Sequence, residues 1–283
     1  MSRCEPTSKT VARWLVALLT VIGIAAPARA ETFPNRTIRI IVPYAPGGSI
    51  DLTARVIAKN LQERVGQSVI VENKPGANAA IGIEDLMRSE PDGHTLIILS
   101  DSPVTINVHL SRVNYDPLTD LVPIGKVVSS PLILTANAKV GIASIADLVA
   151  AAAVASGEVP LAFTDTAAIL PMIGGGQVVA LGVAEPVRSR AMPNIPTLRE
   201  AGVANFSAMS WLAMFAPRGT PDDRISRLNA EIAKIMALPE AQKVLLAAGL
   251  EPAPNSPSEM RQIIEVDYAK WGQLIKTLGL KAE

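Results

Sequence analysis

The chain has very little cysteine. Cys4 is the only one among 283 residues, and it lies ahead of the apolar run WLVALLTVIGIAA, whereas a lipid-carrying cysteine would stand at a cleavage site behind that run. If the first thirty residues are removed, the rest of the chain has no thiol. That excludes disulfides, cysteine nucleophiles and thiolate metal sites.

A surplus of basic charge is also missing. Lys and Arg together number 26, and so do Asp and Glu. Proteins that bind nucleic acids usually carry excess positive charge, because phosphate contacts supply most of their affinity. The balance therefore predicts no nucleic-acid partner and no strong field for membrane attachment. Hydrophobic residues make up 49% of the chain, enough for the core of one large or two ordinary domains.

Catalytic and metal-binding patterns are scarce. Neither His94 nor His109 stands in a His-Glu-x-x-His spacing, and Gly-x-Ser-x-Gly is absent. Asp51, Asp101 and Asp165 could act as an acid–base pair only if the fold brought two of them together, and each also suits a helix cap or a solvated turn. We expect no cofactor, no metal and no enzymatic activity, which leaves a hydrolase as the weakest hypothesis.

The N-terminal segment has the pattern of a secretory signal peptide. Basic residues precede the apolar run, which is too short to span a bilayer comfortably, and Ala28 and Ala30 offer small residues before a cleavage point. We expect residues 1–30 to be removed after export to the periplasm, leaving a chain that begins near Glu31. A retained membrane anchor is the weaker alternative.

The following segments alternate between β-branched runs and helical spacing. Strands in this order with short junctions favour a parallel sheet with right-handed crossovers and helices on both faces. The predicted fold class is therefore α/β. The segments are TIRIIV (37–42), a helix over 50–65 with Gly66 as its C-terminal cap, SVIVEN (68–73), a helix from the junction at 74–82 to about Glu90, and TLIILS (95–100).

Later segments predict a second, smaller lobe. They divide the chain after the signal peptide into a first part of lobe 1 (31–121), lobe 2 (122–210), and a return to lobe 1 with C-terminal helices (211–283). GGGQ (174–177) is interpreted as a helix-ending turn. The segments are IGKVV, LILTA, an alanine-rich helix (144–156), VPLAF (159–163), VVALGV (178–183), WLAMFAP (211–217), and helices over 221–249 and 257–278.

Two glycine-rich junctions, PYAPGGSID (43–51) and KPGANAAIG (74–82), follow predicted strands and precede predicted helices. Ligands of open parallel sheets bind at such strand ends, and the free N–H groups of a helix start attract carboxylate or phosphate. Gly47 and Gly48 would let the backbone approach an anion closely. The alternative is purely structural, because Ser49 and Asp51 are common caps. Neither junction matches a phosphate loop or a dinucleotide fingerprint.

The chain also resembles a known family, the Bug periplasmic substrate-binding proteins of tripartite tricarboxylate transporters. The resemblance covers nearly all of the chain after residue 30 and is most specific at PGGSID, ENKPGA and PNIPTLREAG. It implies a two-lobed type II periplasmic-binding-protein fold with crossed-over strands. It also implies a monomer that closes around a small organic carboxylate and delivers it to membrane permease subunits.

In that family two loops of lobe 1 grip a ligand carboxylate, largely through backbone N–H groups. On lobe 2, Thr164, Asp165 and Thr166 follow a strand, and Ser210 and Trp211 lie near the crossover. Asp165 would repel a carboxylate but could accept a hydrogen bond from an amino group, so amino-acid ligands stay open beside di- and tricarboxylates. Carried over by position, the lobe 1 residues are Tyr44, Ala45, Pro46, Gly47, Gly48, Ser49 and Asp51, with Lys74, Gly76, Ala77, Asn78 and Ala79.

The chain departs from the family at Ala155-Ser156-Gly157, which runs straight into Glu158-Val159. A family segment that meets the far end of the ligand is absent there, so we expect a shortened second lobe. Less buried ligand surface and easier access of water would weaken charged hydrogen bonds. The alternative function is therefore a degenerate family member that binds no solute and acts through a sensor or regulatory protein partner.

Overall fold

The computed structural model describes residues 32–154, 161–204, 206 and 208–280. The predicted signal peptide and the junction at 155–158 lie outside these residues. Arg36–Glu283 forms one compact unit, and the lobes described below belong to it.

Lobe 1 is built on a mixed sheet with the order β2-β1-β3-β7-β4. The first three strands are parallel, and β7 and β4 run antiparallel to their neighbours. The α/β class and the predicted strands at 37–42, 68–73 and 95–100 are confirmed. The strands are β1 (Ile38–Val42), β2 (Val69–Asn73), β3 (Thr95–Ser100), β4 (Leu121–Asn137) and β7 (Met209–Pro217), with the short β8 (Glu251–Pro252) paired to β4.

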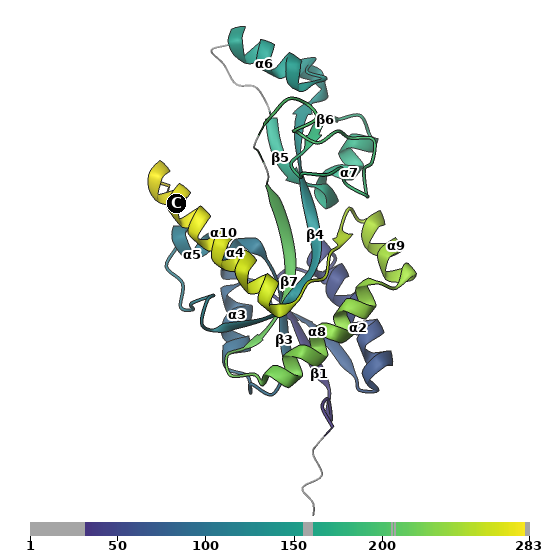
Figure 1. Ribbon diagram of the computed structural model, residues 1–283, viewed down its shortest axis with the longest axis vertical. Coiled ribbons are helices and arrows are strands. Elements are labelled where there is room, and N and C mark those ends of the chain that lie inside the picture. The colour runs from purple at the N-terminus through teal and green to yellow at the C-terminus, as the bar shows by residue number, and fades with distance from the viewer. Residues whose placement is uncertain (1–31, 155–160, 205, 207, 281–283) are drawn as a thin grey trace, which may run out of the picture. The chain divides into compact units, whose positions relative to one another are not determined.

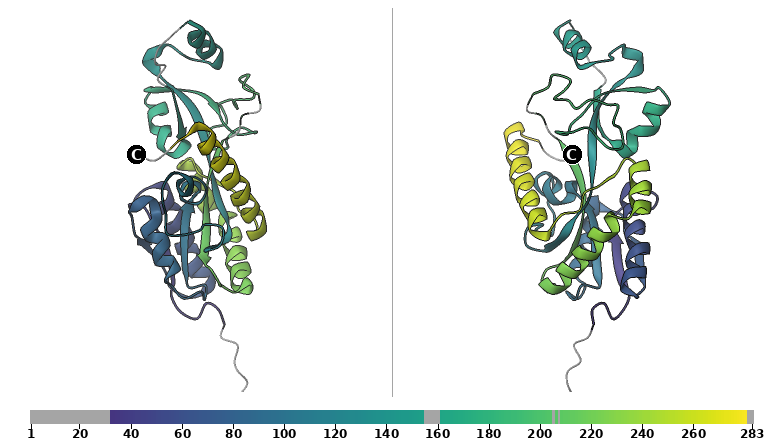
Figure 2. Two further views of the ribbon diagram at one scale, coloured as in Figure 1. Left: turned by 90° about the vertical axis from the view of Figure 1, so that its left-hand side faces the viewer. Right: turned by 45° about the vertical axis from the view of Figure 1, so that its right-hand side comes forward.

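Helices cover both faces of this sheet (Figures 1 and 2). On one face α2 (Ser49–Val65), α8 (Asp222–Met236) and α9 (Pro239–Ala247) contact one another. On the other face lie α3 (Ala80–Met87), α4 (Asp101–Thr105), α5 (Asn107–Leu110) and α10 (Pro257–Leu278). Side chains of α3, α4 and α10 bury a core against the sheet that includes Ile83, Val104, Phe215 and Met260.

Lobe 2 is smaller. Its strands β5 (Leu161–Asp165) and β6 (Val178–Val183) pair antiparallel with the second part of β4. Two apolar clusters lie on its faces, one around Leu134 and Leu198 and one around Ile133 and Ile169. The remaining elements are the turn η3 (Ala138–Val140), α6 (Ile145–Val154) and α7 (Thr166–Gly174).

One long strand replaces two predicted ones. IGKVV and LILTA both belong to β4, which pairs with β7 through Leu121–Pro131 and with β5 and β6 from Leu132 onward. Pro131 does not break the strand, because its missing N–H falls where the partner changes. β4 and β7 thus carry the chain between the lobes, as crossed-over strands (Figure 1).

The predicted helix ends are largely confirmed. Gly66 caps α2 in the left-handed conformation, and after α7 Gly175 N–H and Gln177 N–H donate back to Pro171 O and Met172 O. The predicted helix over 221–249 is instead two helices, because Pro239 starts a new one. No helix in the described part of the chain is long and apolar enough to cross a membrane.

Gly125 lies at an irregularity of β4 where other elements press on the strand. Its φ is +156°, and an added Cβ would stand 2.6 Å from Asn229 Nδ2 and 2.7 Å from Asn255 O. Asn229 Nδ2 donates at 2.8 Å to both Ile124 O and Asn255 O. The position therefore ties β4 to α8 and to the segment before α10.

Replacing Gly125 by Ala should lower the free energy of unfolding by about 2–4 kcal/mol, because it adds a clash to a strained backbone. Gly141→Ala is the matched control. Gly141 also has a positive φ, +73°, but nothing within 4 Å of an added Cβ. It should cost only about 1 kcal/mol. Urea unfolding of both variants measures the difference, and equal losses would show that the clash is not felt.

Candidate functional site

The two glycine-rich loops leave the sheet side by side. Their strands β1 and β2 are parallel neighbours, with Val42 opposite Asn73. Lys74 N–H donates to Val42 O at 2.8 Å. Residues 45–48 and 75–78 are exposed at this edge. The structure therefore brings together the two loops on which the sequence interpretation depends, and leaves both open to solvent.

A buried carboxylate holds the loops in register. Asn73 Nδ2 donates to Tyr44 O at 3.1 Å and to Asp51 Oδ1 at 2.9 Å. Asp51 also accepts from Gly47 N–H at 3.0 Å and from Arg55 Nε and Nη2 at 2.9 and 3.0 Å. Asp51 is 4% exposed, so it fixes the loop from below instead of facing a ligand as predicted. The sequence did not predict a role for Asn73 or Arg55, although the i,i+4 spacing of Asp51 and Arg55 indicates an ion pair.

The first turn of α2 has backbone amides without a hydrogen-bond acceptor in the helix. The Gly47 amide is bound to Asp51, so it is not one of the free donors expected in this loop. Gly48 is the N-cap residue, and no side chain of the described residues caps this helix. Leu52 N–H makes the first helical bond, to Gly48 O. The amides of Ser49 and Ile50 therefore have no intrahelical acceptor and lie at the positive end of a 17-residue helix.

The second loop is not the plain helix start that the sequence predicts. Ala77, Asn78 and Ala79 have φ values of 46°, 49° and 78° and form the short turn η2 (Ala77–Ala79), so α3 begins only at Ala80. Left-handed non-glycine residues cost of order 1–3 kcal/mol each and persist only where the surroundings enforce them. Ala79 is 1% exposed and belongs to the lobe 1 core, which anchors the strained run.

The ammonium group of Lys74 is paired with carboxylates of lobe 1. Its Nζ lies 2.9 Å from Asp85 and 3.8 Å from Glu72. Arg39 binds the same two carboxylates at 2.7 and 3.1 Å. Together these four residues form a balanced network on lobe 1, and both basic residues help to hold the pKa of Asp85 below its usual range against the effect of burial. Lys74 therefore does not lend a free positive charge to the loop in which it stands.

Tyr44 closes the first loop against the third strand. Its hydroxyl lies 3.0 Å from Ser100 Oγ, at the end of β3. Burial raises the pKa of Tyr44, so the phenol stays neutral at physiological pH and can serve as a hydrogen-bond donor. The side chain also packs on the lobe 1 core.

Two carboxylates, one from each lobe, interact electrostatically. Asp101 starts α4 on lobe 1, and Ser210 Oγ donates to its Oδ1 at 2.9 Å. Burial and then the charge of Asp165 raise the pKa of Asp101 to about 6. Asp165, at the end of β5, keeps an exposed surface, yet the protein around it raises its pKa as well, partly offset by Ser130. Among the described residues neither carboxylate has a Lys or Arg in salt-bridge distance. The charge between the lobes is therefore uncompensated.

Two other residues predicted near the ligand serve the fold. Trp211 is 2% exposed, and its Nε1 donates to Asp267 at 3.1 Å, so it packs against α10 instead of walling the site. Thr166 is fully buried and its hydroxyl donates to Pro131 O at 2.7 Å. Thr164 is half-buried on β5 beside Asp165.

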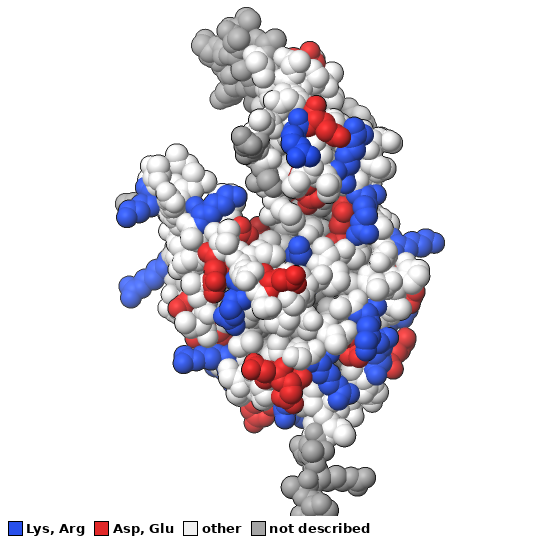
Figure 3. All heavy atoms as spheres, in the orientation of Figure 1, with Lys and Arg blue, Asp and Glu red and all other residues white. Residues whose placement is uncertain are grey.

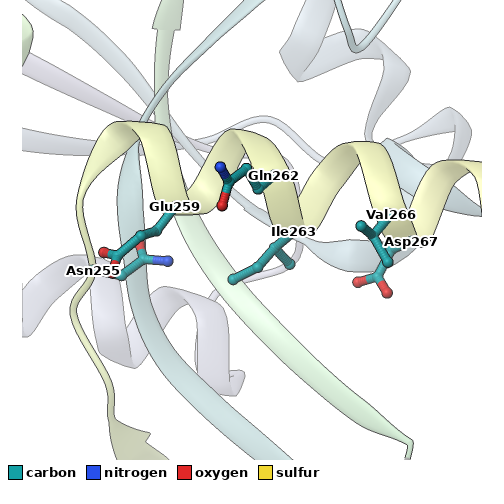
Figure 4. Close-up of a pocket in the computed structure, with 6 residues that line it drawn as sticks. All are labelled: Asn255, Glu259, Gln262, Ile263, Val266 and Asp267. Carbon is teal, nitrogen blue, oxygen red and sulfur yellow. The ribbon is translucent and has the colours of Figure 1, made fainter.

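The structure also has hollows away from the predicted loops. A cavity of about 470 Å³ runs along α10 and is lined by Asn255, Glu259, Gln262, Ile263, Val266 and Asp267 (Figure 4). Another, of about 340 Å³, adjoins the strained loop at Ala77 and Asn78 and reaches α5. In the described residues no group of three or more His, Cys, Asp or Glu side chains is placed to hold a metal ion.

Comparison with known proteins gives one family. The model of the family described as "Tripartite tricarboxylate transporter family receptor" matches residues 53–162 and 150–280. The two matches meet at 150–162, where the sequence analysis places the missing segment. Protein BugT of Bordetella pertussis is 31% identical over 311 aligned residues, which cover 93% of this chain and 95% of BugT. Because this alignment is longer than the whole chain, BugT has residues without a counterpart here.

Solved structures agree with the fold. One described as a periplasmic transporter, and Rpa4515 of R. palustris with adipate, each superpose with a TM-score of 0.76 at 26% identity. Each match covers 88% of this chain and 99% of the other. The two-lobed type II fold that the resemblance implied is confirmed.

Asp51→Asn should lower the free energy of unfolding at pH 7 by roughly 1–2 kcal/mol, since Arg55 is half exposed and water screens the pair. Arg55, together with the hydrogen bonds from Gly47 and Asn73, lowers the pKa of Asp51 from 3.8 to about 2, so this stability is present above pH 3.8 and is lost as the pH falls through 2. Chemical denaturation from pH 7 to 2 tests this, with Glu63→Gln on the exposed face of α2 as control. A variant curve parallel to the parent curve would contradict the assignment.

Proposed function

The chain belongs to the tripartite tricarboxylate transporter receptor family, and from this we propose that it captures a small organic carboxylate in the periplasm and delivers it to membrane permease subunits. The observation that carries the proposal is the uncapped start of α2, exposed beside the second loop and held from below by Asp51 and Asn73.

Backbone amides supply the positive potential at this edge. The basic residues nearest the two loops, Arg55 of α2 and Lys74, are paired with Asp51 and Asp85. A ligand carboxylate would therefore meet the amides of the first turn of α2 and the positive end of its dipole. Hydrogen bonds from amides to a charged acceptor contribute about 1.5–3 kcal/mol each. Two or three of them are enough for selective capture once lobe 2 excludes water.

The relatives support the same class of ligand. Rpa4515, a dicarboxylate-bound neighbour at 26% identity, contains adipate. The matched family consists of receptors, in keeping with a protein that binds without catalysing a reaction. Export through residues 1–30 would place the chain where the neighbouring periplasmic proteins act. We propose a monomer, with one ligand between two lobes.

The carboxylates between the lobes refine the ligand class. Asp101 and Asp165 would repel a second ligand carboxylate at close range, and no described basic residue in salt-bridge distance offsets them. An ammonium group would satisfy both the charge and the open acceptor sites. We therefore propose that the ligand is an amino acid with a carboxylate at the α2 start and its amino group toward Asp165, in preference to a plain dicarboxylate.

Ser49→Pro tests the amide site. Proline suits the first helical position and Gly48 already has the extended ψ of 175° that a residue before proline adopts, so the variant should fold while losing one N–H. Affinity for the bound carboxylate should fall tenfold or more. Ser49→Ala, which deletes only the hydroxyl, is the matched control and should bind nearly as the parent does.

Isothermal titration calorimetry with di-, tri- and aminocarboxylates provides the measurement, and native mass spectrometry of protein from the periplasm identifies any retained ligand. If the folded parent binds none of the panel and carries no small carboxylate, the transport proposal fails. A receptor that acts only through a protein partner then becomes the better account. Equal affinity of the Pro and Ala variants would reject the α2 amides as the carboxylate site.

Asp165→Asn tests the ligand class separately. Removing the charge should weaken binding of an aminocarboxylate about tenfold, because the attraction to its ammonium group is lost. It should strengthen binding of the matching plain dicarboxylate, because the repulsion of its second carboxylate disappears. Aspartate against succinate and glutamate against glutarate are suitable pairs. Thr164→Val, a neighbouring change without charge, should leave the ratio of affinities unaltered. If Asp165→Asn shifts both members of a pair alike, the residue does not discriminate an amino group.

A further inference from the structure

One side-chain contact joins the lobes beside the two crossing strands. Glu251, in β8 of lobe 1, accepts from Ser189 Oγ at 2.5 Å, from Arg190 N–H at 2.8 Å and from Arg190 Nε at 3.4 Å. Arg190 Nη2 also donates to Pro252 O at 2.9 Å. Ser189 and Arg190 belong to the connection between β6 and β7, which packs into lobe 2 through Met192.

This contact lies where it can control the angle between the lobes. β4 and β7 pair with each other through the crossing, and a two-stranded ribbon bends and twists more easily than a packed core. The contact is attached to the other edge of β4, because β8 pairs with Val128 and Ser129 of that strand. A third tie beside the ribbon limits the rotation that the ribbon alone would allow.

A second carboxylate is buried next to this tie. Glu185 is 9% exposed, and its Oε1 has no hydrogen-bond partner among the described residues. The charged groups around it come from several elements. Lys126 of β4 attracts it, Glu251 of β8 repels it, Glu259 of α10 competes for Lys126, and Arg190 stands in its own segment. On the face shown in Figure 3, basic and acidic atoms lie side by side where lobe 2 meets lobe 1.

We propose that the contact of Glu251 with Ser189 and Arg190 is an interlobe latch, and that the charge of Glu185 decides how firmly the latch holds. When Glu185 is neutral, its buried carboxyl is tolerated and the latch stays closed. When it is ionised, its unpartnered oxygen and the neighbouring Glu251 favour movement of the 185–190 segment into water, which pulls Ser189 and Arg190 from Glu251.

The direction with pH follows from the environment of Glu185. Burial, and next the charge of Glu251, raise the pKa of Glu185 to about 7, against an ordinary value of 4.5 once it reaches water. The latched state therefore holds its proton more tightly. Its advantage is complete below pH 4.5, declines as the pH rises and is lost above 7. The lobes should be held together in acid and released near neutrality.

Distance measurement between the lobes tests this without any ligand, so its result is independent of the proposed function. With Cys4 replaced by serine, Glu63→Cys on α2 and Lys139→Cys on lobe 2 offer two exposed spin-label sites. Pulsed electron paramagnetic resonance at pH 5 and pH 8 should show one narrow distance in acid. At pH 8 the ratio of released to latched molecules should rise about tenfold or more.

Glu185→Gln should stay latched at both pH values, and Glu240→Gln, an exposed change on α9, should respond as the parent does. Glu251→Ala removes the acceptor of all three bonds and should be released at both, and Ser189→Ala, which removes only the bond from Oγ, should be intermediate and provides a milder variant if Glu251→Ala misfolds. Circular dichroism checks folding in each case. A pH response that survives Glu185→Gln overturns the role of Glu185, and unchanged distances in folded Glu251→Ala and Ser189→Ala overturn the latch.

Discussion

The hydrogen bonds between Asp51, Asn73 and the first loop are the constraint on which the candidate site depends. Without them, Gly47 and Gly48 would let the loop adopt many conformations, and the first amides of α2 would face no fixed point. Asp51 restrains Gly47 from within α2, and Asn73 joins that loop to the end of β2. The start of α2 and the end of β2 are thereby held side by side.

Neither loop directs a basic side chain toward the proposed ligand position. A free Lys or Arg side chain would bind any anion, and it would bind a dicarboxylate through either of its two carboxylates. Arg55 and Lys74 are instead used to neutralise carboxylates of lobe 1. Amides fixed by the fold impose both distance and direction on a hydrogen bond, so at the proposed site geometry, more than charge, would select the ligand.

Much of the fold could be predicted from the sequence, because β-branched runs, helical spacing and glycine caps are local signals. The adjacency of the two loops also followed, since parallel strands end at one edge. What could not be predicted were roles set by long-range partners. Asp51 and Lys74 look available in sequence but are bound by Asn73 and Asp85 in space, and Trp211 resembles a site wall until α10 covers it. The left-handed run at Ala77–Ala79 likewise has no sequence signal, since alanine normally favours a right-handed helix.

A second lobe shortened as the sequence predicts would make the angle between the lobes more important than it would be in a longer relative. Fewer residues on lobe 2 would mean fewer contacts to a ligand, so in the proposed site most selectivity on that side would come from Asp165 and its neighbours. A single carboxylate can discriminate only if it is held at the right distance from the α2 amides. That distance is set by the crossing strands and by the contact between Glu251 and Arg190. Small changes in the latch would therefore change ligand preference as well as affinity, because they would move Asp165, the charged residue of lobe 2 that we propose to face the ligand.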